Sequence, residues 1–143
     1  MSEQQATAAT TTTAAHEMPA HGTVCWTELA SKDLDAAKKF YSELFGWKLT
    51  VSDVAGMAYT EFHAGGRPVG GMHQMTAEFG DAPSHWMSYV AVDDVDAAAA
   101  RVEALGGKVC VPPTDIPTVG RFSVITDPSG ATISMLTLKG PNQ

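Results

Sequence analysis

Residues 33–47 read DLDAAKKFYSELFGW, and residues 93–107 read DDVDAAAARVEALGG. Each stretch begins with an aspartate suited to cap a helix, continues with apolar residues at helical spacing, and ends at glycine. In the first stretch the cap, apolar stripe and stop are Asp33, Leu34, Ala37, Tyr41, Leu44 and Gly46. In the second they are Asp94, Val95, Ala98, Val102, Leu105 and the pair Gly106 and Gly107. Every stripe residue of the second stretch lies 61 positions after its counterpart, which predicts a duplicated module.

Short segments rich in β-branched and aromatic residues surround both predicted helices. One strand precedes each helix, at 23–29 and at 85–92. Three strands follow each helix, at 47–51, 58–63 and 68–74 in the first half and at 108–111, 121–126 and 131–138 in the second. The sequence therefore predicts an α+β fold in which two tandem βαβββ modules form a curved, cup-shaped mixed sheet with the helices outside. We expect one domain over 21–140, with modules at about 22–75 and 84–139.

Composition restricts the partners of the chain. Its formal charge of −7 and its nine Lys and Arg residues disfavour binding to nucleic acid. No apolar run approaches the roughly 20 residues of a membrane span, so we expect no membrane partner. Cys25 and Cys110 lack metal-type spacing and are expected to be buried and reduced, which predicts a cytoplasmic protein. Residues 1–20 have neither the basic start nor the apolar stretch of a signal peptide, and are expected to be a disordered tail.

The two helix motifs, together with DPSGATISML at 127–136, resemble the vicinal oxygen chelate superfamily over about residues 22–139. This superfamily includes glyoxalase I, extradiol dioxygenases, fosfomycin-resistance enzymes and bleomycin-resistance proteins. The resemblance implies a cup that binds a small molecule and is often shared between the chains of a homodimer. In metal-using members, four His, Gln or Glu ligands come from the first and last strands of each module.

Here the four corresponding positions carry Trp26, Gly70, Met87 and Ser134, with an uncertainty of one residue at Gly70. An indole, a glycine and a thioether do not supply the donors that a divalent cation needs. We therefore expect no metal and no other cofactor.

Alternation along the first strand places Trp26 and Glu28 on the cup face, and their counterparts Met87 and Tyr89 lie 61 positions later. Glu28 is a candidate general acid or base whose pKa apolar surroundings would raise, with Tyr89 as its hydrogen-bond partner. A purely structural carboxylate bonded to Tyr89 is the alternative. Further ligand-binding candidates are Trp26, Phe62, Met72, His85, Met87 and Ser134.

Histidines leave one other arrangement open. His63, His73 and His85 form a possible metal site of a different kind, although alternation places His73 on the helix side, opposite Gly70 and Met72. Gly70 and Gly71 together indicate a bulge or a close backbone approach. Residues 75–83 are expected to link the modules, and 112–119 to form a loop near the mouth of the cup.

Three functions follow from these observations. The first is a small-molecule-binding protein without a metal, which takes an apolar or aromatic metabolite. The second is a metal-independent isomerase, lyase or cyclase that uses Glu28 for proton transfer. The third is a metal-dependent lyase or dioxygenase with displaced histidine ligands.

Overall fold

The computed structural model describes residues 18–54 and 56–139. The first module contains β1 (Val24–Ser31), α2 (Leu34–Phe45), β2 (Lys48–Val54), β3 (Met57–Ala64) and β4 (Arg67–Gln74). A short 3-10 helix, η1 (Ala77–Phe79), lies in the segment between the modules. The second module contains β5 (His85–Ala91), α3 (Val95–Val102), β6 (Lys108–Ile116), β7 (Gly120–Thr126) and β8 (Thr132–Leu138). The predicted repeat of one strand, one helix and three strands is therefore confirmed.

Both helices begin at the predicted aspartates. Asp33 Oδ1 accepts a hydrogen bond from the backbone N–H of Ala36, and Asp94 Oδ1 accepts one from Ala97, each at 3.1 Å. Such caps satisfy backbone donors that the first helical turn leaves without a partner. Gly46 ends α2 in the left-handed conformation, with φ 74°, which a residue with a Cβ adopts only at a cost.

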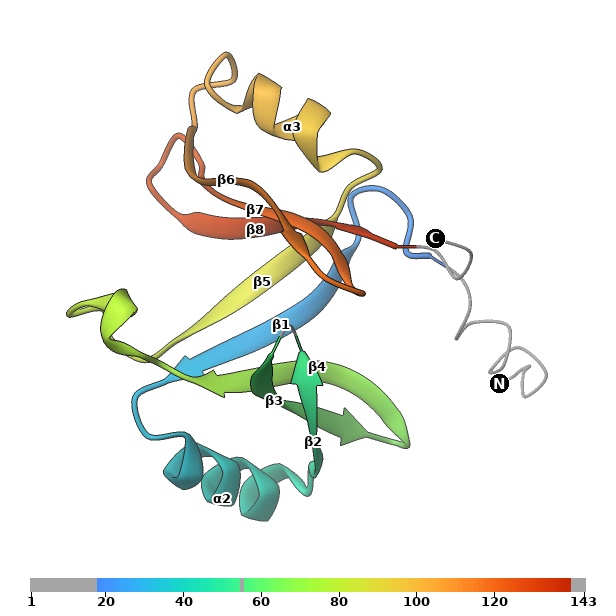
Figure 1. Cartoon of the computed structure of the whole chain (residues 1–143), viewed down its shortest axis with the longest axis vertical. Helices are drawn as coiled ribbons and strands as arrows, with labels where there is room; N and C mark the ends of the chain where they lie inside the picture. The colour runs from blue at the N-terminus through green and yellow to red at the C-terminus, as the bar shows by residue number, and fades with distance from the viewer. Residues whose placement is uncertain (1–17, 55, 140–143) are drawn as a thin grey trace.

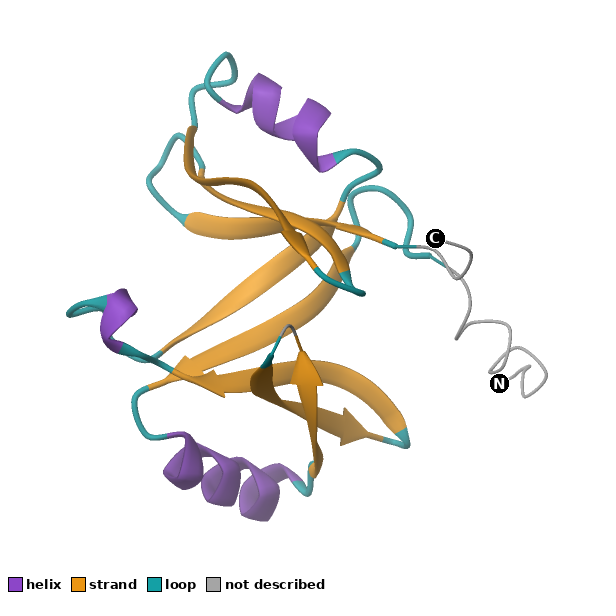
Figure 2. Cartoon of the chain, viewed as in Figure 1, coloured by secondary structure: helices purple, strands orange, loops and turns teal. Residues whose placement is uncertain are grey.

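All eight strands form one open mixed sheet in the order β2-β3-β4-β1-β5-β8-β7-β6. Within each module the first and last strands pair in parallel, β1 with β4 and β5 with β8. The modules join through the antiparallel pair β1 and β5, which lie in the middle of the molecule (Figure 1). The helices lie at opposite ends, with the strands between them (Figure 2). One chain therefore supplies both halves of the sheet.

Each helix covers its own hydrophobic cluster. Under α2 the buried residues are Leu29, Phe62 and Met72, whereas in the second cluster Val95 and Val102 of α3 itself pack with Met135 of β8. Phe62 and Met72 thus belong to the core on the helix side of the sheet. Their predicted exposure to a ligand in the cup is wrong.

The structure differs from the predicted elements in three further places. The last stripe residues, Leu44 and Leu105, are 59% and 64% exposed, because Leu44 lies at the end of its helix and Leu105 beyond the shorter α3. β6 continues through Pro112 to Ile116, where a loop was expected. As β6 is an edge strand, its prolines need not donate to a neighbouring strand. Cys110 is exposed, whereas a buried thiol was expected.

None of the described helices is long and apolar enough to cross a bilayer. Of the predicted disordered tail, residues 1–17 lie outside the described part of the chain.

Candidate functional site

A cavity of about 490 Å³ opens on the face of the sheet opposite the helices. Both modules line it, and most of the lining is apolar. The apolar side chains that line it come from β2, β3, β6, β7, β8 and the turn between β6 and β7: Val54, Met57, Ile116, Val119, Phe122, Leu136 and Leu138. Cavities of this size and character are typical of sites for small organic molecules.

Glu28, on β1, is the centre of a hydrogen-bond network in this cavity. Its Oε2 accepts a bond of 2.8 Å from the hydroxyl of Tyr59, and its Oε1 accepts one of 3.0 Å from the hydroxyl of Tyr89. The Nε2 atom of His73 lies 3.5 Å from Oε1, at the long limit for a hydrogen bond within an ion pair. Trp26 donates its indole N–H to the Tyr59 hydroxyl at 2.8 Å. Each carboxylate oxygen thus accepts at least one hydrogen bond from the protein.

Gly71 allows Tyr59 to enter this network. Glu28 on β1 is the partner of Gly71 on β4, and Gly71 is in turn the partner of Glu61 on β3. Tyr59 starts on β3 and reaches across β4 to meet Glu28. A Cβ atom at Gly71 would overlap the Tyr59 hydroxyl and its ring. The glycine therefore provides the space that the ring of Tyr59 occupies.

Two opposed effects act on the pKa of Glu28. Burial is the largest single influence and raises it, but interactions with His73, Tyr59 and Tyr89 together outweigh burial. The pKa of Glu28 therefore lies below its ordinary value of 4.5, and the expectation of a raised pKa is wrong. Interaction with Glu28 likewise raises the pKa of His73 above 6.5, against the effect of burial. The pair is favoured in its ionised form.

The two tyrosines remain hydrogen-bond donors. Burial, followed by the charge of Glu28, raises the pKa of both Tyr59 and Tyr89. Neither phenol will ionise near neutral pH. Glu28 therefore accepts two stable hydrogen bonds and is a poor proton acceptor under those conditions.

The predicted site residues divide into two groups. Trp26, Glu28 and Tyr89 come together at the cavity as expected. Met87 is the partner of Glu28 on β5, but it is absent from the residues that line the cavity. His85 lies at the start of β5, with its Nδ1 atom 2.8 Å from the carbonyl oxygen of Pro83, and also outside the lining.

Ser134 lies on β8 opposite Tyr89 and is fully buried. Among the described residues no hydrogen bond of good geometry reaches its hydroxyl oxygen, although its interaction with Tyr89 acts to lower the pKa of that phenol. The serine therefore lies beneath the cavity and not on its surface.

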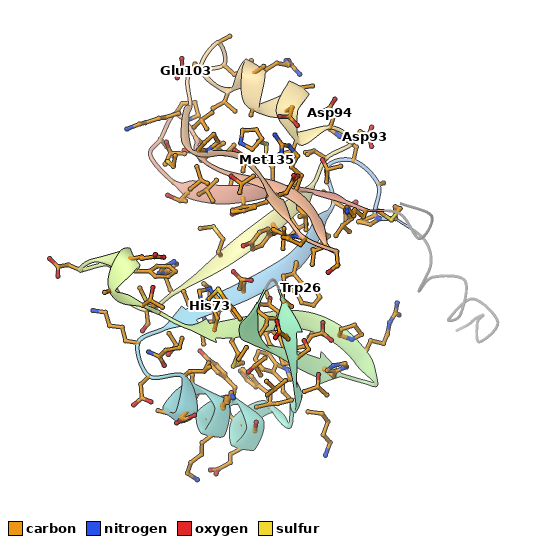
Figure 3. All side chains as sticks on the ribbon, in the orientation of Figure 1. Trp26, His73, Asp93, Asp94, Glu103 and Met135 are labelled. Carbon is orange, nitrogen blue, oxygen red and sulfur yellow. The ribbon has the colours of Figure 1, made fainter. Side chains whose placement is uncertain are left out.

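His73 faces the cavity, and its predicted position on the helix side is wrong. On β4, Gly71 and His73 face the cup, whereas Met72 faces α2. Figure 3 shows Trp26 and His73 in the middle of the molecule, between the two helices. Cys25 also lines the cavity beside Trp26, because β1 shifts its register between Val24 and Trp26.

Sequence reasoning missed Tyr59 and Glu61, which also line the cavity. Both lie in the strand predicted at 58–63, where alternation opposes them to the core residue Phe62. That alternation was a usable signal. The contact of Tyr59 with Glu28 across Gly71 could not be predicted from the sequence in this way, because it depends on the pairing of β3 with β4.

A family-type divalent cation does not fit the residues present. Within 18–54 and 56–139, no three His, Cys, Asp or Glu side chains are grouped closely enough to hold a metal. Glu28 and His73 are two possible ligands, but both oxygens of Glu28 already accept hydrogen bonds from tyrosines. Hard divalent cations need several oxygen or nitrogen donors that replace their water.

Comparisons with known proteins agree on the fold. Residues 23–135 match the family model described as "Glyoxalase/Bleomycin resistance protein/Dioxygenase superfamily". The Mycobacterium tuberculosis protein named "Putative glyoxylase CFP32" is 43% identical over 116 residues, which cover 80% of this chain and 44% of that protein. The Streptomyces peucetius "Anthracycline biosynthesis protein DnrV" is 36% identical over 129 residues, which cover 81% of this chain and 47% of that protein.

Among solved structures, the Mn(II)-bound glyoxalase from Novosphingobium aromaticivorans is 25% identical, with a TM-score of 0.58. The match covers 84% of this chain and 40% of that one. The chain spans about half the length of the curated relatives it matches. From the family model and the duplicated βαβββ fold, we conclude that this chain belongs to the glyoxalase, bleomycin-resistance and dioxygenase superfamily.

Proposed function

We propose that the cavity binds a small apolar or aromatic metabolite and that it does so without a metal ion of its own. The observation that carries this proposal is a cavity of about 490 Å³ whose lining is mostly apolar. Its polar core is satisfied by protein hydrogen bonds. A ligand entering this cavity gains contact with apolar side chains and need not replace the bonds of Glu28.

Aromatic side chains favour a flat ligand. Trp26, Tyr59, Tyr89 and Phe122 all line the cavity, and such rings pack well against planar molecules. The name of the DnrV relative supports the same class, since anthracyclines have a planar, fused-ring aromatic core. We propose the class of ligand only.

Proton transfer by Glu28 in a metal-independent isomerase, lyase or cyclase is less well supported. Its pKa is lowered, and both of its oxygens already accept hydrogen bonds. A His-based metal enzyme is weaker still, because His85 lies apart from the cavity that His73 lines. The homodimer and the cytoplasmic location implied above remain predictions, and light scattering of the purified protein tests the first.

A blocked cavity tests the proposed function. Met57 is exposed and lines the cavity at the start of β3, on the same face as Tyr59 and Glu61, so Met57→Trp adds bulk to the cavity without disturbing either hydrophobic cluster. Ala64→Trp is the matched control, since Ala64 is exposed at the other end of the same strand and is absent from the lining. The probe is 2-methylnaphthalene, followed by quenching of tryptophan fluorescence.

We expect wild type and Ala64→Trp to bind the probe with equal affinity, and Met57→Trp to bind it at least tenfold more weakly. Equal binding by all three proteins would place the ligand elsewhere and reject the proposal. If Met57→Trp weakens binding as expected, mass spectrometry of small molecules that co-purify with the protein would name the natural ligand class.

A further inference from the structure

We propose that Glu61 recognises the ligand by accepting a hydrogen bond, so that the aromatic ligand carries a donor group, most favourably a protonated amine. This inference rests on the proposed function, because it assigns the chemistry of a ligand in the same cavity. It also transfers the recognition role from Glu28, the carboxylate that the sequence singles out, to a second carboxylate on β3.

Glu61 lies where a ligand would meet it. It lines the cavity and shares the cup face of β3 with Tyr59 and His63, while Phe62 between them faces the core. Across the sheet, Glu61, Gly71 and Glu28 are successive partners on β3, β4 and β1. The two carboxylates therefore lie in one row on the same face, separated by a glycine.

Glu28 and Glu61 differ in whether a carboxylate oxygen is free to accept a hydrogen bond from a ligand. The Glu28 side chain is 18% exposed, and both of its oxygens accept protein hydrogen bonds. The Glu61 side chain is 36% exposed, and its one described polar contact is from Oε1 to His63 Nε2 at 3.2 Å. Among the described residues, nothing donates to Glu61 Oε2. That oxygen is free to accept a bond from a ligand.

His63 holds the Glu61 side chain in position. Its Nε2 atom lies 3.2 Å from Glu61 and 3.3 Å from the Thr50 hydroxyl, so it is fixed between β2 and β3. Because Thr50 and Glu61 are cross-strand partners, the contact is set by the pairing of these strands. His63 is thus a positioning residue, and Glu61 is the one that touches the ligand.

The chemistry of the acceptor defines the ligand. A carboxylate accepts hydrogen bonds but donates none, so its partner must carry an N–H or O–H group. A protonated amine adds charge attraction to the bond, and the net charge of −7 favours the approach of a cation. The apolar side chains that line the cavity contact the hydrocarbon part of the same molecule.

Two probes with the same ring system separate the contribution of the hydrogen bond to Glu61 from that of the apolar contacts. At pH 7, 2-naphthylmethylamine offers a protonated amine, whereas 2-methylnaphthalene offers the ring alone. Calorimetric titration gives the affinity ratio of the two probes for each protein. Glu61→Gln removes the charged acceptor, and Glu103→Gln removes the same charge from a site beside α3, far from Trp26 and His73 in Figure 3.

Wild type and Glu103→Gln should bind the amine about tenfold more tightly than the methyl compound, as expected for a partly exposed charge-assisted hydrogen bond. Glu61→Gln should reduce this ratio to about twofold or less and leave the affinity for 2-methylnaphthalene unchanged. His63→Gln should give an intermediate ratio, and it replaces Glu61→Gln if that variant does not fold.

If the amine still binds about tenfold more tightly than 2-methylnaphthalene in both Glu61→Gln and His63→Gln, Glu61 is not the residue that recognises the amine. Equal binding of both probes by wild type, with both blocked by Met57→Trp, also overturns the assignment to Glu61 and leaves the proposed function intact. Failure of wild type to bind either probe rejects the proposed function itself.

Discussion

Substitution of Gly71 by alanine tests how the site is assembled. The added Cβ would overlap the hydroxyl and ring of Tyr59, so the ring must leave its position above β4. Two hydrogen bonds of 2.8 Å are then lost, one from Trp26 to Tyr59 and one from Tyr59 to Glu28. The backbone of Gly71 is not in the left-handed region, so alanine itself introduces no backbone strain.

The magnitude follows from these bonds. Loss of the neutral bond from Trp26 costs about 1 kcal/mol, and loss of the bond to the Glu28 carboxylate costs about 1.5 to 3 kcal/mol. Alanine restricts the unfolded chain and returns about 0.4 to 1 kcal/mol. We therefore expect Gly71→Ala to reduce the free energy of unfolding by about 1.5 to 3.5 kcal/mol.

Urea unfolding of a double-mutant cycle with Tyr59→Ala checks the cause. If the clash with Tyr59 is responsible, Gly71→Ala should change stability by less than about 0.5 kcal/mol once that ring is gone. An undiminished cost in the Tyr59→Ala background would refute the steric explanation. A cost below about 0.5 kcal/mol in wild type would show that Tyr59 has room to move without loss.

Three further predictions address the core, the ion pair and the helix caps. Met72→Ala should lower the free energy of unfolding by about 2 to 5 kcal/mol, because Met72 is fully buried under α2, and a loss below about 1 kcal/mol in urea unfolding would contradict its place in the core. The stabilisation from Glu28 is present above pH 4.5 and is lost as pH falls through its lowered pKa, whereas that from His73 is present below pH 6.5 and is lost as pH rises through its raised pKa. The stability difference between wild type and His73→Gln should therefore be greatest between pH 4.5 and 6.5 and should shrink towards pH 9, and a difference that grows towards pH 9 would reverse the assigned sign. Asp94→Ala removes the bond to the Ala97 N–H and should cost about 0.5 to 2 kcal/mol, and Asp93→Ala at the neighbouring exposed position should change stability less if the cap is responsible.

The duplicated fold was predictable because its signals are local. A capping aspartate, a helical stripe and a terminal glycine recur 61 residues apart, and each depends on nearby residues. The same offset pairs Glu28 with Tyr89, and the structure joins these two side chains by a hydrogen bond. Both residues lie on first strands whose alternation can be counted from the following helix.

The face of β4 was not predictable in the same way. Side chains alternate along a strand, so an error of one residue moves every side chain to the other face. Counting from the terminal turn placed Gly70 on the cup face, whereas the structure places Gly71 there, as the partner of Glu28. Because of this error of one residue, Met72 was predicted in the cup and His73 on the helix side, the reverse of what the structure has. The register between β1 and β4 is a long-range property that the local sequence of β4 does not specify.

A titration with and without metal tests the central claim most directly. Untagged protein is treated with EDTA, divided in two, and titrated with 2-methylnaphthalene in the absence and presence of excess Mn²⁺. We predict the same dissociation constant in both titrations, because the cavity wall is apolar and the oxygens of Glu28 are held by Tyr59 and Tyr89. Binding that appears only after Mn²⁺ is added would contradict a metal-independent site.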